Sequence, residues 1–91
     1  MKLVQPAVAG TVESSDVMVT VEPADTVTVD LHSNVKKQFG ASITATVLAV
    51  VKELGITGVK ITLEDKGALD CTIKARTSTA LKRGLAAKEV L

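Results

Sequence analysis

The spacing of apolar residues changes twice along this chain, and each change marks a change of secondary structure. Between residues 17 and 31 apolar and polar residues alternate, which is typical of strands with one buried face. Apolar residues then recur every three or four positions from Val35 to Leu54, as in an amphipathic helix. Alternation returns between residues 59 and 75. A helix between two such segments predicts an α+β domain in which the helix covers a sheet.

Each alternating segment predicts a β-hairpin. In the first, the strands are residues 17–22 and 27–32, and a three-residue loop at 23–25 places Val21 opposite Val27. In the second, the strands are residues 59–64 and 69–75, and Gly67 takes the positive φ of the turn. Residues 77–91 predict a second, short helix. The expected order is ββαββα, a two-layer α+β sandwich whose four-stranded antiparallel sheet is covered by one main helix.

The main helix has candidate caps and a candidate core face. Ser33 and Asn34 are residues that cap helix N-termini, and Gly55 suits a left-handed C-terminal cap. Phe39→Ala should cost about 3–5 kcal/mol, because removing a buried aromatic ring leaves a cavity. The predicted core consists of Val17, Val19, Val21, Val29, Leu31, Phe39, Ile43, Val47, Leu54, Ile61, Leu63 and Ile73.

The size and composition exclude several functions. Ninety-one residues form one domain, 1–91, and the net charge of +1 with a single aromatic residue argues against binding nucleic acid. One cysteine and one histidine cannot build a zinc site. The most apolar stretch, residues 41–51, is too short to span a bilayer, so no membrane role is expected and the protein is predicted to be cytoplasmic.

No set of residues predicts catalysis by this chain. Cys71 has the apolar parity of its predicted strand, which indicates a buried, inert thiol. His32 has the polar parity and no partner at motif spacing, as expected of a solvated surface residue. A nucleophile with its base cannot be assembled, so the chain is predicted not to be an enzyme. A mildly positive, solvated surface is expected from Lys74, Arg76, Lys82, Arg83 and Lys88.

The cluster Glu13-Ser14-Ser15-Asp16 has two interpretations. Spacing alone favours an ordinary polar entry into a strand. The alternative is a serine that another enzyme modifies, since residues 1–15 predict a flexible, loop-like N-terminal arm and an exposed hydroxyl on such an arm can enter an active site. On that interpretation, residues 10–16 should be exposed and mobile.

The chain resembles the citrate lyase acyl carrier protein family, the gamma subunits of that complex. The resemblance rests on three separated blocks in the same order and at the same spacing. These are residues 5–18 (QPAVAGTVESSDVM), residues 35–40 (VKKQFG) with Gly58-Val59, and residues 65–71 (DKGALDC) with Ala75-Arg76. The family pattern at the serine is Glu-Ser-Gly-Asp, and Ser15 stands at the glycine position.

The resemblance implies a carrier function centred on Ser14. Ser14 would bear a phosphoribosyl dephospho-coenzyme A group through a phosphodiester, and the thiol of this group would carry acetyl and citryl thioesters. The implied partners are the transferase that attaches the group, the alpha subunit (an acyl transferase) and the beta subunit (a citryl lyase). Together these subunits cleave citrate to acetate and oxaloacetate.

Two other functions remain open. The carrier subunit of malonate decarboxylase holds the same kind of group, although the segment from Ala9 to Ser14 favours citrate lyase. The chain could also be an unmodified α+β interaction or regulatory module that only binds partner subunits.

Overall fold

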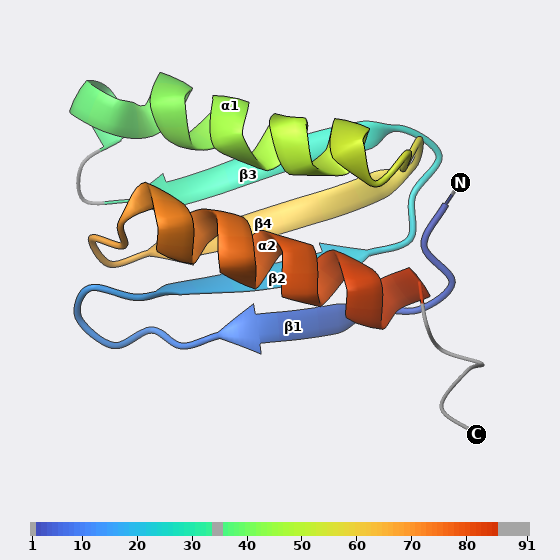
Figure 1. Ribbon diagram of the computed structural model, residues 1–91, viewed down its shortest axis with the longest axis horizontal. Helices are drawn as coiled ribbons and strands as arrows, with labels where there is room; N and C mark the ends of the chain where they lie inside the picture. Colours follow the sequence, from blue (N-terminus) through green and yellow to red (C-terminus); the bar gives the residue numbers. More distant parts are fainter. Residues whose placement is uncertain (1, 34–35, 86–91) are drawn as a thin grey trace.

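The computed structural model describes residues 2–33 and 36–85, with the backbone alone for residues 36–39 (Figure 1). A sheet of four strands forms one layer, and two helices lie side by side on one of its faces (Figure 1). The elements are β1 (Ala7–Gly10), β2 (Val17–Glu22), β3 (Val27–Ser33), α1 (Lys36–Glu53), β4 (Val59–Asp65) and α2 (Asp70–Leu85). The α+β class is confirmed. The order and pairing of the elements differ from the prediction.

The first predicted hairpin is wrong, because β4 lies between β2 and β3. The sheet order is β1-β2-β4-β3, with β2 antiparallel and β3 parallel to β4. Val21 therefore pairs with Ile61, and Val27 pairs with Val59. Alternation determines which side chains share a face but not which strand is the neighbour. A helical crossover joins parallel strands, and α1 provides one between β3 and β4.

The second predicted hairpin is also wrong, because the expected strand 69–75 is the first half of α2. Five residues of α2 are buried, and their spacing of three and four is helical. They are Ile73, Thr77, Ala80, Leu81 and Gly84. The prediction divided this segment near residue 76 into a strand and a helix, and residues 69–75 alone also fit an alternating pattern. The helical period was therefore missed. The second helix is thus longer than expected and shares the covering of the sheet with α1.

Part of the predicted N-terminal arm is a strand. Residues 7–10 form β1 and pair antiparallel with β2, from Ala7 opposite Val21 to Gly10 opposite Met18. The preceding residues are tied to the end of α2, where the amides of Val4 and Gln5 both donate to the Gly84 carbonyl. Residues 3–6 form no strand or helix but are bonded to α2, and the exposed loop of this arm lies between β1 and β2.

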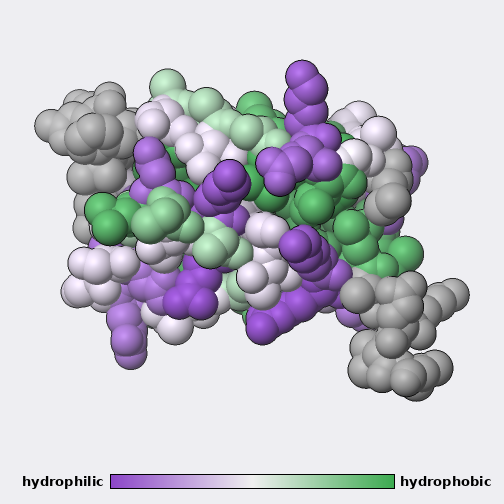
Figure 2. Space-filling model, in the orientation of Figure 1, coloured by the Kyte–Doolittle hydropathy of each residue, from purple (hydrophilic) through white to green (hydrophobic). Residues whose placement is uncertain are grey.

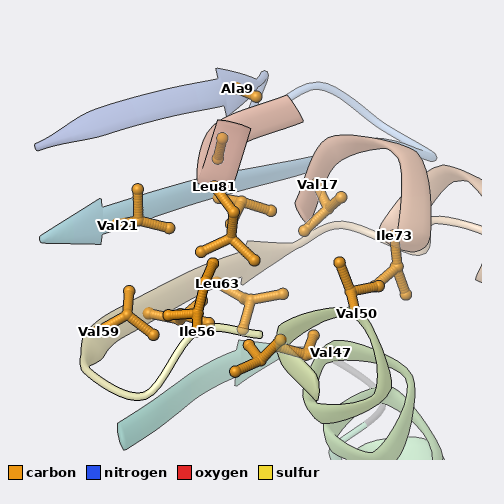
Figure 3. Packing of buried hydrophobic residues seen from close by; sticks show 14 of the residues in the cluster. Ala9, Val17, Val21, Val47, Val50, Ile56, Val59, Leu63, Ile73 and Leu81 are labelled. Atoms are coloured by element: carbon orange, nitrogen blue, oxygen red, sulfur yellow. The ribbon is translucent and has the colours of Figure 1, made fainter. Parts of the chain in front are cut away.

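The core lies between the sheet and the two helices (Figure 3). Val17 and Val21 of β2 and Leu63 of β4 point toward Val47 of α1 and Leu81 of α2. The predicted core residues are buried, with two exceptions that are half-buried, Val29 and Leu54. The side chain of Phe39 lies outside the described residues, so its predicted contribution is untested.

The end of α1 follows the prediction. Gly55 has a φ of +70°, its amide donates to the Lys52 carbonyl, and the Ile56 amide donates to the Val51 carbonyl. These two bonds form a Schellman cap. At the other end of α1, Asn34 lies outside the described residues, and Ser33 belongs to β3, where its hydroxyl donates to Asp65. Across the described parts of the chain, no helix is both long and apolar enough to cross a membrane.

Candidate functional site

Ser14 lies in the loop that joins β1 to β2, at the end of the sheet where β4 also finishes (Figure 1). Residues 11–15 of this loop are exposed, as predicted, whereas Gly10 and Asp16 at the two ends of the predicted range 10–16 are half-buried; the mobility of the segment stays a prediction. Asp16 is half-buried and Val17 is fully buried, so the chain passes from solvent into the core within three residues of Ser14. The serine is therefore presented to solvent directly above a rigid strand.

The base of this loop is held by the turn between β4 and α2. The Ser15 amide donates to the Lys66 carbonyl at 2.8 Å, and the Lys66 amide donates to the Asp16 carbonyl at 2.9 Å. Within the loop, the Asp16 amide donates to the Glu13 carbonyl at 3.1 Å, which closes a turn over residues 13–16. Ser14 thus occupies a central position of a turn whose C-terminal side is fixed to a second loop.

Ser15 adopts a left-handed backbone conformation. Its φ of +65° is the only positive φ of a non-glycine residue among those the structure describes. Glycine adopts this conformation without a steric penalty, whereas a side chain costs about 1–2 kcal/mol. This geometry gives a physical reason for the glycine that the family resemblance implies at the position of Ser15.

The carboxylate of Asp16 connects the loop to β2 and α2. It accepts the Thr11 hydroxyl at 2.6 Å and the Val17 amide at 2.7 Å. The Arg76 guanidinium donates to both of its oxygens, each at 3.2 Å. The Thr11 hydroxyl, the Val17 amide and the Arg76 charge together lower the pKa of Asp16 from 3.8 to about 2. The loop is therefore bonded to two elements through one ionised side chain.

Gly10 lets the end of β1 lie close to Val17 of β2 and to Arg76 of α2. It has a φ of +93°, and a Cβ at this position would collide with the Val17 carbonyl and lie 3.2 Å from Cδ of Arg76. Glycine is therefore required by the close approach of Gly10 to the Val17 backbone and by the positive φ of Gly10.

The neighbouring turn is organised by a buried carboxylate. Asp65 is 1% exposed and accepts the amides of Gly67 and Ala68 at 3.2 and 2.9 Å. Its other oxygen accepts the Ser33 hydroxyl at 2.8 Å. Gly67 has a φ of +93°, as predicted for this turn, although the turn leads into a helix and not into a strand. Asp65 thereby fixes the backbone to which the serine loop bonds.

The remaining candidates lie away from any reactive cluster. Cys71 is exposed in the first turn of α2, which corrects the prediction of a buried thiol. His32 is exposed, as predicted, and lies 3.3 Å from the Asp30 carboxylate. In the parts of the chain that the structure describes, no group of acidic, histidine or cysteine side chains is arranged to hold a metal ion.

The predicted basic surface is only partly a free, solvated one. Arg76 is bonded to Asp16, and Arg83 donates to the Val8 carbonyl at 2.8 Å. Lys74 and Lys82 are exposed, whereas Lys88 lies outside the described residues. Sequence reasoning missed the bond between Arg76 and Asp16, because their 60-residue separation gives no local pattern. The available signal was that both residues belong to the blocks that carry the family resemblance.

Proteins with similar sequences identify the family to which this chain belongs. The chain is 53% identical over 83 residues to the citrate lyase acyl carrier protein of Haemophilus influenzae (strain PittEE), covering 91% of this chain and 87% of that protein. It is 54% identical over 84 residues to the protein of the same name from Streptococcus uberis, covering 91% and 83% of the two chains. This chain belongs to the citrate lyase acyl carrier protein family.

Two further comparisons extend this assignment. The citrate lyase acyl carrier protein of Latilactobacillus sakei is 54% identical over 86 residues, covering 93% of this chain and 85% of that one. The profile of a family described as the malonate decarboxylase delta subunit matches residues 4–84. Acyl carriers of citrate lyase thus share a sequence profile with a malonate decarboxylase subunit.

A solved structure from Thermus thermophilus shares the fold alone. It superposes with a TM-score of 0.60 at 15% identity and covers 93% of this chain. This chain spans only 16% of that larger protein, so the β1-to-α2 arrangement also occurs as a small part of a longer polypeptide.

Proposed function

We propose that this chain is the acyl carrier subunit of a citrate lyase and that Ser14 is its attachment site. The observation that carries this proposal is the exposed serine at residue 14, on a loop anchored to a rigid body, in a chain more than 50% identical to citrate lyase acyl carriers. Ser14 would hold phosphoribosyl dephospho-coenzyme A through a phosphodiester. When attached, this group supplies the thiol that carries acetyl and citryl.

The residues around Ser14 fit a bulky covalent group. Its neighbours Glu13 and Ser15 are exposed, so an adduct projects into solvent without displacing core side chains. Lys66 is exposed, and its backbone bonds to Ser15 and Asp16, so one cationic residue belongs to the turn beside the serine loop. The chain's role is to present the hydroxyl and to carry the group, and the group supplies the reactive atom.

Attachment needs no oxidant or reductant. The Oγ of Ser14 attacks a phosphorus atom of an activated precursor that bears a diphosphate leaving group. The new O–P bond forms as the bond to the diphosphate breaks, and the hydroxyl proton passes to a base of the transferase. This chain contributes the orientation of Oγ through the turn 13–16 and the bonds of Asp16.

The partner subunits would perform the two acyl steps. The alpha subunit would exchange acetyl for citrate on the thiol that the group supplies, with release of acetate. The beta subunit would release oxaloacetate and leave acetyl on the carrier. The carrier must therefore reach three enzymes in turn, namely the transferase and both subunits, which an exposed loop at one end of a compact body allows.

Malonate decarboxylase is the second candidate, because a profile described as its delta subunit matches residues 4–84. Reconstitution separates the two functions. The modified chain should restore citrate cleavage when it is mixed with the alpha and beta subunits of citrate lyase, and it should not restore malonate decarboxylation with the corresponding enzyme subunits. Activity with malonate alone would reassign the chain.

A further inference from the structure

Two exposed apolar side chains lie in or beside the serine loop, residues 11–16. Leu69, in the turn before α2, is 71% exposed, the largest value among the exposed large apolar residues of the described chain, and Val12 is 53% exposed. Val12 lies in the same loop as Ser14, and Leu69 lies in the turn to which that loop bonds. Apolar atoms are visible at this end of the helical face (Figure 2).

Leucine is an unfavourable residue at position 69, directly before the first residue of α2. The Leu69 carbonyl accepts the Ile73 amide at 3.0 Å, which makes Leu69 the N-cap of α2. Serine, threonine, aspartate or asparagine would bond to the free amides of the first turn there, whereas leucine does not. An exposed leucine at an N-cap therefore contributes little to folding, and such local conflicts are found at functional sites.

Leu69 lies close enough to Ser14 to share one contact surface. Paired strand residues are about 5.5 Å apart between Cα atoms, and three further residues extend at most about 11 Å. The path from Ser14 to Leu69 runs through the bonded pair Ser15 and Lys66, so the two Cα atoms are no more than about 20 Å apart. The turn at residues 65–68 is curled, which makes this distance shorter. A specific contact covers about 800 Å² on each partner, a patch roughly 32 Å across.

A recess adjoins Leu69. It has a volume of about 490 Å³, and its lining includes Ser42 and Ile43 of α1 together with Ala68 and Leu69 of the turn. An exposed apolar side chain beside an apolar recess is the arrangement that anchors a protein contact, because each can be buried against the partner.

We propose that Val12, Leu69 and this recess form the docking surface for the enzyme that esterifies Ser14, and that this enzyme covers Leu69 with an apolar side chain. The inference rests on the proposed function. The occupant is the esterifying enzyme because it must enclose Ser14 in its active site, and a patch roughly 32 Å across that contains Ser14 has room for Leu69 as well.

The chain offers a matched control on another surface. Leu48 of α1 is 43% exposed and lines a groove of about 580 Å³ with Val29 and Leu31 of β3. β3 is the edge strand farthest from β1 in the sheet order, so this groove is separated from the serine loop. Nothing in the structure connects it to Ser14.

The test measures attachment to the wild type and three variants, Leu69→Ala, Leu69→Ser and Leu48→Ala. Intact mass follows the adduct over a range of carrier concentrations, and titration with the transferase, without precursor, gives Kd. Both Leu69 variants should raise KM and Kd about tenfold or more, the loss expected on truncating a central apolar anchor, with kcat unchanged. Leu48→Ala should match the wild type. Leu69→Ser should also raise the urea midpoint of the free chain by capping α2, which separates binding from folding.

Several results would overturn the inference. If the Leu69 variants keep wild-type KM and Kd, or if Leu48→Ala alone raises them, the enzyme docks elsewhere. If the wild-type chain forms a dimer that Leu69→Ala dissociates, the surface binds a second copy of the chain. If the Leu69 variants change only the reactivity of the thiol in the modified protein, the attached group itself occupies the recess. Absence of any adduct on the wild type would instead remove the proposed function, and the docking surface with it.

Discussion

The backbone at Ser15 links the sequence of the loop to its shape. A left-handed residue follows the proposed attachment site, Ser14, and it lies in the turn 13–16 that returns the chain to β2. Serine tolerates this conformation at a cost, whereas glycine adopts it freely. The family resemblance implies a glycine where this chain has Ser15, and the positive φ found here gives a physical reason for a glycine at that position.

Substitution at Ser15 should therefore follow backbone preference. Ser15→Val should be about 1–2 kcal/mol less stable than Ser15→Gly, because a β-branched side chain is strongly disfavoured at a positive φ. Urea unfolding of both variants measures the difference. Equal stabilities would mean that the loop does not hold residue 15 at the φ of +65° found here.

The bond between Asp16 and Arg76 joins the serine loop to α2 and should show a characteristic pH dependence. The pKa of Asp16 falls from 3.8 to about 2 on folding, so its stabilising contribution is complete above the unfolded value. That contribution decreases as the pH falls below about 4 and is lost as the pH passes through about 2. The difference in unfolding free energy between wild type and Asp16→Asn should follow this course.

Urea titrations at a series of pH values test this prediction. Asp25→Asn is the control, because the Asp25 side chain is 99% exposed and its ion pair with Lys2 is a surface one. Its difference from the wild type should stay small at every pH. A difference for Asp16→Asn that disappears already near neutral pH would contradict the lowered pKa of Asp16.

Sequence patterns predicted which face of each strand or helix is buried, but they did not predict which strands pair with each other. The alternation of β2, β3 and β4 and the stripe of α1 from Ile43 to Leu54 were correct, because burial imposes these periods directly, and Val35 and Phe39 of the predicted stripe stay untested. The insertion of β4 between β2 and β3 was missed, since pairing across 30 or more residues leaves no local signal. α2 was read as a strand at its start because seven residues are too few to separate the two periods.

α2 should be as important for stability as α1. Leu81 is fully buried between α2 and the sheet (Figure 3), so Leu81→Ala should cost about 2–5 kcal/mol through lost apolar contact and a cavity. Leu69→Ala, at the N-cap of the same helix, should change stability little because Leu69 is exposed. The free energy of urea unfolding gives both values. A Leu81→Ala variant as stable as the wild type would show that α2 does not pack on the sheet as described.

The whole molecule places its chemistry at one end. The core between the sheet and the helices holds β2 and β4 rigidly, and the serine loop and the β4–α2 turn project together from the end of these two strands (Figure 1). The assignment of Ser14 as the attachment site comes from the family resemblance and stays a prediction. Lys66 and Arg76, which support the serine loop, were not predictable, because they reach the loop only through the fold. The carrier function therefore depends on a small body that holds one loop in place and leaves its tip free.

The most direct test of this account is the intact mass of the wild type, Ser14→Ala and Ser15→Ala after incubation with transferase and precursor. The wild type and Ser15→Ala should each gain one phosphoribosyl dephospho-coenzyme A group, and Ser14→Ala should gain none while keeping wild-type stability, since its hydroxyl is exposed. An adduct on Ser14→Ala but not on Ser15→Ala would move the site by one residue. A wild-type chain that never gains mass would contradict the carrier function and favour an unmodified interaction module.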